Sequence, residues 1–434
     1  MKSHPEATGA RRAAEIHGLS AWCIAAAFGA YFCMYGFRRP FTAAGYDQLT
    51  PWGAGYKTAL VVAQVAGYML AKFIGIRVVS GMRPGRRAWA ILSLAGAAQV
   101  ALLAFALLPP PWNLAAMFLN GLSLGMVFGL VLGFLEGRRT TEALTAGLCA
   151  SFILADGVTK STGAWLLAMG VGPFQMPAAA GFLYALPLLF FVWMLTRIPQ
   201  PTPADIAARR ERAPMSGADR MALLRECGAG LYLLTGVYLL LTILRSLRAD
   251  FAPELWQGLG QAPLAVDFTR TEVLVTAGVI VLNGMAVLIT DHQRTFFFAM
   301  ALSISGFALT GLAAAGLSGG RLGGFGFMTL SGLGLYLPYV ALHTTIFERL
   351  ISMTGARGNL GFLLYFADSF GYLGYAGVML VRVALPPGEG FLGFFLDFSR
   401  IVTLLSIIML FCCLVWFGRR GQPAAAGTSQ LAVD

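Results

Sequence analysis

The chain has 434 residues, of which 57% are hydrophobic and only 12% are charged, and its mean hydropathy is +0.71. No soluble domain of this length could bury so much apolar surface, and apolar stretches of about 17–25 residues recur that are long enough to cross a membrane. The formal net charge of +11 is gathered in alternate loops, which argues against nucleic acid as a partner. We therefore predict an all-α polytopic membrane protein.

Twelve apolar segments follow one another, and we expect each to be a transmembrane helix. They lie approximately at residues 20–44, 57–79, 88–108, 113–135, 143–169, 176–196, 228–249, 270–290, 295–317, 322–346, 358–384 and 398–417. The only long polar stretch divides them six and six. The predicted regions are a cytoplasmic N-terminus (1–19), an N-terminal six-helix bundle (20–196), a cytoplasmic linker (197–227), a C-terminal six-helix bundle (228–417) and a disordered cytoplasmic tail (418–434).

The alternation of basic and uncharged loops follows the positive-inside rule. It predicts that both termini lie in the cytoplasm, and we expect the protein in the inner membrane of a bacterium. The six cysteines fall mostly inside apolar runs without paired spacing, which favours a packing role. The sequence has no phosphate-binding loop, metal-ligand cluster or nucleophile–base pair. We expect no enzymatic activity, no cofactor and no metal.

Two arginines end matching apolar runs in the two halves. Arg38 lies in "MYGFRRPF", and Arg245 lies in "LTILRSLRADFAP". A charge at the centre of a membrane helix costs at least about 2.5–3.5 kcal/mol, so it indicates a functional site. An arginine suits an anion because its planar fork holds two oxygens and stays charged. By hydropathy both lie toward the outer ends of their spans, where a snorkelling arginine would give the same pattern.

Two pairs of acidic residues also repeat. Glu136 precedes Asp156 by the same interval at which Glu348 precedes Asp368, and each aspartate follows an alanine. Together with the matched arginines, these pairs favour a duplicated six-helix unit.

Four segments carry a family resemblance: "MYGFRRPF", "GYMLAKFIGIRVVSGMRPGRR", "LRSLRADFAPELW" and "ALHTTIFERLISMTGARGNLGFLLYFADSFGYLGY". The chain resembles the major facilitator superfamily and, within it, the organophosphate:phosphate antiporters. It departs from that family at Ser80, Asp156, Lys160 and Asp368, which indicates a divergent branch with a different anion.

The resemblance implies a major facilitator fold with two pseudo-symmetric bundles. It also implies a secondary transporter that moves an anionic, phosphorylated organic solute by exchange or ion coupling. The residues expected to bind this solute are Arg38, Arg245, Lys72, Lys160 and Arg39. Neighbouring arginines on a helix point about 100° apart, so only one can face the interior, and the resemblance favours Arg38. Lys72 could instead snorkel to the cytoplasmic face.

Asp156 and Asp368 lie about 15 Å into their spans, near mid-membrane. Asp156 precedes Lys160 by one helical turn and can form a neutralised pair with it. Alternatively, the two aspartates balance the arginines when the site is empty, or one of them carries a coupling proton.

A third group of residues is expected to act as a gate at the cytoplasmic ends of the helices. Its members are Glu136, Glu348, Arg83, Arg86, Arg87, Asp291, Arg294 and His343. Topology alone also explains most of these arginines, and His343 could be an ordinary interfacial histidine.

Two other functions stay open at this stage. One is a proton-coupled carrier of another organic solute or of a lipid. The other is a membrane sensor that has a transporter fold but does not transport. We expect a monomer whose only partners are a small anionic solute and the lipid bilayer.

Overall fold

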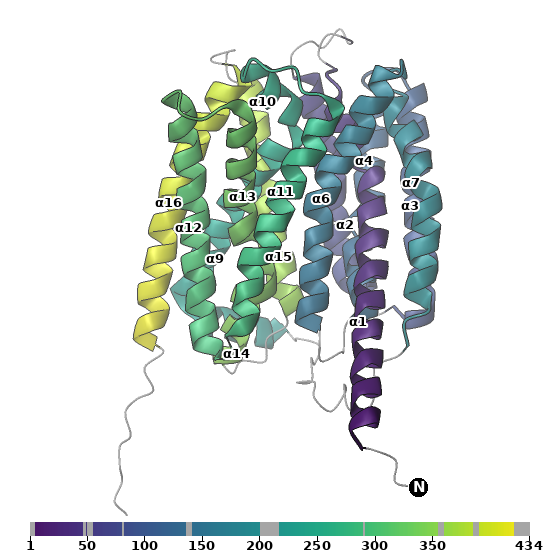
Figure 1. Cartoon of the computed structure of the whole chain (residues 1–434). Helices are drawn as coiled ribbons and strands as arrows, with labels where there is room; N and C mark the ends of the chain where they lie inside the picture. The colour runs from purple at the N-terminus through teal and green to yellow at the C-terminus, as the bar shows by residue number, and fades with distance from the viewer. Residues whose placement is uncertain are drawn as a thin grey trace, which may run out of the picture.

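The computed structural model describes residues 5–46, 49, 55–79, 82–135, 141–199, 217–289, 291–354, 360–384 and 390–420. Its long helices run side by side along one direction (Figure 1). The short helix α10 (Ala252–Gly258) marks the upper end of the molecule in Figure 1. Helix α1, the first described helix, begins at the lower end, where α14 (Phe347–Thr354) also lies.

The first half of the chain forms one bundle. Its helices are α1 (Pro5–Gly36), η1 (Pro40–Ala43), α2 (Tyr56–Val78), α3 (Pro84–Leu107), α4 (Asn113–Leu124), α5 (Val127–Leu135), α6 (Thr141–Ala168) and α7 (Met176–Thr196). Helix α1 packs on α6 and α7, while α4 packs on α2 and α3.

The second half forms the other bundle. Besides α10 and α14, its helices are α9 (Gly217–Asp250), α11 (Ala265–Gly284), η2 (Met285–Leu288), α12 (His292–Ser318), α13 (Gly324–Ala341), η3 (Leu342–Ile346), α15 (Leu360–Ala384) and α16 (Phe391–Arg420). Helix α9 packs on α15 and α16, and α12 packs on α13. In the described residues, every predicted span coincides with one helix or with consecutive helices.

Nine helical segments of the described residues are long and apolar enough to cross a membrane, which identifies an integral membrane protein. The predicted spans outside this group are α6, α11 and α15, which carry buried charged residues such as Asp156, Glu272 and Asp368. Two of the main contacts between the bundles are α6 against α11 and α2 against α15. A helix that faces another bundle in place of lipid can hold polar side chains. The low hydropathy of α6, α11 and α15 therefore indicates that they lie at the interface between the two bundles.

The predicted linker is partly helical, because α9 already begins at Gly217. Within α9 the backbone leaves helical geometry only at Gly228, where φ is 55°, a left-handed value that glycine tolerates best. Residues 200–216 of the linker and 421–434 of the tail lie outside the described residues. The domain boundaries therefore stay a prediction.

Candidate functional site

The first span is broken where its two arginines lie. Helix α1 stops two residues before Arg38, and Pro40, which has no N–H, begins the separate helix η1. The Asn120 amide donates a hydrogen bond to the Phe37 carbonyl (3.0 Å), and the Gln64 amide donates one to the Arg38 carbonyl (3.1 Å). These bonds replace the helical ones lost at the break, as buried backbone requires.

This break corrects the expectation that only one of the two neighbouring arginines can face the interior. Arg38 and Arg39 are each only 3% exposed. Their side chains lie in the turn between two helices, so the 100° divergence of a continuous helix does not apply. Arg39 forms ion pairs with Asp156 of α6 and with Asp250 at the end of α9, while Arg38 lies against aromatic rings.

Arg38 and Arg245 have matching surroundings. The Arg38 guanidinium carbon lies 3.9 Å from the centre of the Tyr68 ring and 5.9 Å from that of Tyr35. The Arg245 guanidinium carbon lies 4.3 Å from the centre of the Tyr339 ring and 5.9 Å from that of Tyr336. Each half of the molecule thus presents one arginine on two tyrosines.

A fifth tyrosine connects the two halves. The Tyr372 ring packs edge-on against Tyr68, with ring centres 5.5 Å apart, and lies in the electric fields of both Arg38 and Arg245. We call Arg38 and Arg245, together with Tyr35, Tyr68, Tyr336, Tyr339 and Tyr372, the arginine–tyrosine site.

Neither arginine of this site forms an ion pair with any residue that the structure describes. The Nε atom of Arg38 and the Nε and Nη2 atoms of Arg245 are buried without a hydrogen-bond partner. A buried charge costs several kcal/mol in lost hydration, while a desolvated cation–π contact returns about 2 kcal/mol. The site therefore has an excess of two positive charges that an anion would compensate.

A second group of charges lies nearby and is balanced. It consists of Arg39, Lys160, Arg248, Asp156, Asp250 and Glu272, which we call the ion-pair cluster. Besides the pairs of Arg39, Lys160 pairs with Asp156, and Arg248 pairs with Glu272 at 2.8 Å. Three basic groups thus meet three acidic ones, and the cluster carries no net charge.

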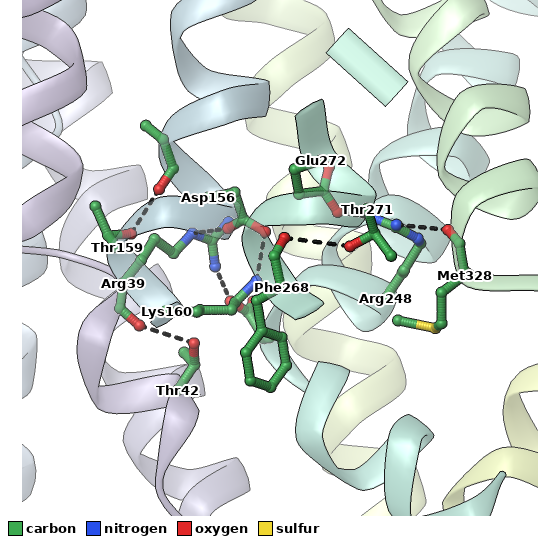
Figure 2. Close-up of polar contacts among 12 residues, drawn as sticks. Arg39, Thr42, Asp156, Thr159, Lys160, Arg248, Phe268, Thr271, Glu272 and Met328 are labelled. Carbon is green, nitrogen blue, oxygen red and sulfur yellow. Dashed lines mark hydrogen bonds and ion pairs between the residues drawn. The ribbon is translucent and has the colours of Figure 1, made fainter. Parts of the chain in front are cut away.

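Figure 2 shows how the ion-pair cluster joins the bundles. Arg39, Asp156 and Lys160 come from the first half of the chain, and Arg248 and Glu272 come from the second. Helices α6 and α11 meet here without a gap: a Cβ on Gly157 would lie 2.7 Å from the Glu272 side chain. The remaining cavity of about 10 Å³ is at the lower limit for one water molecule.

Lys72 and Asp368 connect α2 with α15 in a separate ion pair. Hence neither predicted aspartate balances Arg38 or Arg245 in this structure. Asp156 pairs with Lys160 and Arg39, and Asp368 pairs with Lys72. Asp368 also accepts a hydrogen bond from Tyr238, whose hydroxyl lies 3.2 Å from Nε2 of His343. His343 is buried and does not lie at an interface with solvent.

The other predicted gate residues have mixed surroundings. Asp291 caps α12 by accepting a hydrogen bond from the Arg294 backbone N–H at 2.7 Å, and Arg87 donates a hydrogen bond to the Gly133 carbonyl. Glu136 lies outside the described residues, and Glu348 is half-buried at the start of α14. Arg83 and Arg86 line a surface cavity of about 400 Å³. The gate stays a prediction.

Sequence reasoning missed several residues of this region. Glu272 lies inside the predicted span at 270–290 and could have been found as an acidic residue in an apolar segment. Gln64 and Asn120 could have been found as polar residues in mid-span. Arg248 follows Arg245 by three positions, the spacing of one helix face, which was a usable signal.

Comparisons with known proteins give a family and a fold. A family of unknown function, DUF5690, matches residues 40–420. No curated protein matches. A point mutant of the nucleoside transporter NupG superposes with a TM-score of 0.61 at 14% identity, over 92% of this chain and all (100%) of that one. A bacterial homologue of the human drug peptide transporters PepT1 and PepT2 has a TM-score of 0.61 at 12% identity, over 92% of this chain and 99% of that one.

Likeness at such low identity establishes the fold alone. The predicted major facilitator fold is confirmed. The narrower resemblance to organophosphate:phosphate antiporters is not supported by any of these matches.

Proposed function

This chain belongs to DUF5690, a family of unknown function, and we propose that it is a secondary active transporter for an anionic organic solute. The matched structures include a nucleoside transporter and a homologue of peptide transporters, so this fold carries solutes of different kinds. The substrate class must therefore be argued from the site.

One observation carries the proposal: Arg38 and Arg245 are buried, come from different bundles and have no acidic partner among the described residues. A ligand with two negative charges would neutralise both. A phosphate monoester carries about −1.5 to −2 charges at pH 7 and offers three oxygens to the two guanidinium forks. A phosphorylated solute is therefore the favoured substrate, with Lys72 as an auxiliary contact.

The ion pairs between the bundles give alternating access a physical basis. Lys57 pairs with Glu254 at 2.6 Å near the upper end, and Arg39 pairs with Asp250. Lys72, about 22 Å further along α2 from Lys57, pairs with Asp368. We assign the first two pairs to closure above the site and the third to closure below it. Arg39 then acts in closure, while Lys160 pairs with Asp156 inside α6, and neither binds the solute directly.

Uptake by purified protein in liposomes tests this function. The substrates are labelled inorganic phosphate, sugar phosphates, glycerol phosphates and carboxylates. Wild type should accumulate at least one of them in exchange for the same solute inside. Arg38→Ala and Arg245→Ala should each abolish uptake, while Arg270→Ala, which removes an exposed arginine of α11, should not. Normal uptake by either of the first two variants would refute the two-arginine site.

A sensor on the same fold would give a different outcome. It would bind one of these anions with the same dependence on Arg38 and Arg245 but show no counterflow. Binding of the anion without flux would therefore indicate a sensor in place of a transporter, and the two-arginine anion site would still stand.

A further inference from the structure

A chain of hydrogen bonds lies beside the arginine–tyrosine site and joins four helical elements. Tyr238 of α9 donates its hydroxyl hydrogen to Oδ1 of Asp368 on α15. The same hydroxyl lies 3.2 Å from Nε2 of His343 in η3. The other imidazole nitrogen, Nδ1, lies 2.9 Å from the Tyr339 carbonyl oxygen of α13. All four residues are buried.

The number of hydrogens in this chain can be counted. The Tyr339 carbonyl only accepts, so Nδ1 of His343 must carry a hydrogen. In a neutral imidazole Nε2 is then an acceptor without a hydrogen. The single hydrogen of the Tyr238 hydroxyl cannot serve both Nε2 and an ionised Asp368. With neutral His343 and ionised Asp368, one of the two contacts therefore joins two acceptors.

One added proton completes the chain. It can sit on Nε2, which then donates to the Tyr238 oxygen while Tyr238 donates to the Asp368 carboxylate. It can equally sit on Asp368, which then donates to the Tyr238 oxygen while Tyr238 donates to Nε2. Both forms satisfy every contact with the same number of protons. We infer that Asp368, Tyr238 and His343 form a binding site for a single shared proton, which serves as the coupling ion of transport.

The charged surroundings link this proton to the solute. Four charged or titratable groups interact electrostatically with His343 or Asp368: Lys72 of α2, Arg245 of α9, Tyr339 of α13 and Tyr372 of α15. Arg38 in turn interacts with Tyr372. Arg38, Arg245 and Lys72 disfavour a further positive charge while the arginine–tyrosine site is empty. An anion in that site would remove this repulsion, so proton and anion should bind cooperatively. This coupling rests on the proposed function, whereas the proton site itself rests on the hydrogen-bond chain.

Proton counting tests the site without any solute. Purified protein in detergent is titrated from about pH 9, which is above ordinary histidine titration, down to the lowest pH at which it stays folded. Compared with wild type, Asp368→Asn and His343→Gln should each take up about one proton fewer per molecule. The double variant should also take up only one fewer, because the two residues share that proton. Tyr238→Phe, which removes only the connecting hydroxyl, should lose the same proton.

An exposed histidine serves as the matched control. His292→Gln combined with Asp368→Asn should show the sum of the two single effects, because His292 is exposed at the start of α12 and lies outside the hydrogen-bond chain. A loss of two protons in the Asp368/His343 double variant would show independent titration and overturn the shared site. Equal uptake by wild type and all three single variants would overturn it as well.

Flux measurements then test the coupling. In liposomes with labelled inorganic phosphate as the probe, the readout is the ratio of uptake driven by an inward proton gradient to exchange without a gradient. This ratio should fall at least tenfold in Asp368→Asn and in His343→Gln, and an unchanged ratio would refute coupling. If wild type neither binds nor exchanges phosphate, the proposed function fails for this anion, while proton counting still decides whether the shared proton exists.

Discussion

Arg38 and Arg39 are neighbours in the sequence, yet they lie in regions of opposite electrostatic character. Arg39 belongs to the ion-pair cluster, where three basic and three acidic groups cancel. Arg38 belongs to the arginine–tyrosine site, where two guanidinium groups lie on aromatic rings without an acidic partner. The cluster supplies its own counter-charges and needs no ligand, whereas the site lacks them.

The difference shows that a buried charge with a structural role and a buried charge with a binding role need different surroundings. A charge that stays buried in every state is best neutralised by the protein itself, as in the cluster. A charge that must hold a mobile anion has to stay without a permanent counter-ion, at a cost to stability. Substitutions in the two regions should therefore act on different quantities, and the following predictions use that contrast.

The largest effect is expected on stability, from Arg39→Ala. This change leaves Asp156 and Asp250 with one basic partner fewer in a buried place, which typically costs about 3–5 kcal/mol. Chemical unfolding in mixed micelles should show this loss. Arg38→Ala, the matched control one position away, should leave stability unchanged or raise it, because it removes an uncompensated charge. Equal destabilisation by both variants would contradict the proposed difference between the ion-pair cluster and the arginine–tyrosine site.

For anion affinity we expect the larger effect from substitutions in the arginine–tyrosine site. Arg38→Ala or Arg245→Ala should weaken binding of the preferred anion by about 2–5 kcal/mol, the usual cost of truncating one side of a buried charged contact. Titration calorimetry on purified protein measures this change. The idea would fail if Arg38→Ala bound the anion as tightly as wild type does.

An intermediate effect is expected where the two bundles are in closest contact. A methyl group at Gly157 would overlap the Phe268 carbonyl and the Glu272 side chain, so Gly157→Ala should cost about 1–3 kcal/mol through overpacking. It should also favour separation of α6 and α11, which crosslinking of cysteines placed in these helices would detect. Gly170→Ala is a poor control because φ there is 88°, whereas Gly96→Ala has free space and should be neutral.

The smallest effect is expected at the upper end of the interface. Lys57 is buried, but the side chain of its partner Glu254 is 26% exposed, so water screens the pair. Glu254→Gln should change stability by no more than about 1 kcal/mol and should mainly alter how often the upper end opens. Single-molecule distance measurements between labels on α2 and α10 would report that opening. A stability loss as large as that of Arg39→Ala would contradict the proposed order of the closing contacts.

The fold could be predicted because apolar segments of membrane length leave few alternatives. The two-bundle organisation and the position of each span followed from hydropathy, the polar stretch after residue 196 and the matched Arg38 and Arg245. Hydropathy could not show the break before Pro40, because Phe37, Pro40 and Phe41 keep the segment apolar. It therefore also missed that both neighbouring arginines turn inward.

The candidate site could be predicted only in part. Single intramembrane charges such as Arg38, Arg245 and Asp368 stand out in an apolar chain. Their partners do not, because the pairing of Arg39 with Asp250 or of Lys72 with Asp368 joins residues 211 and 296 positions apart. The tyrosines were missed because an aromatic residue in a membrane helix is ordinary until its ring is seen against a guanidinium.

One measurement decides whether Arg38 and Arg245 together hold an anion. The Tm of purified wild type, Arg38→Ala, Arg245→Ala and Arg270→Ala is measured against rising concentrations of phosphate, sugar phosphates, glycerol phosphates, nucleotides and carboxylates. A bound ligand stabilises the folded state by mass action. At least one anion should raise the Tm of wild type and of Arg270→Ala in a concentration-dependent way and leave the other two variants unchanged. An equal rise in all four proteins would contradict an anion site built on these two arginines.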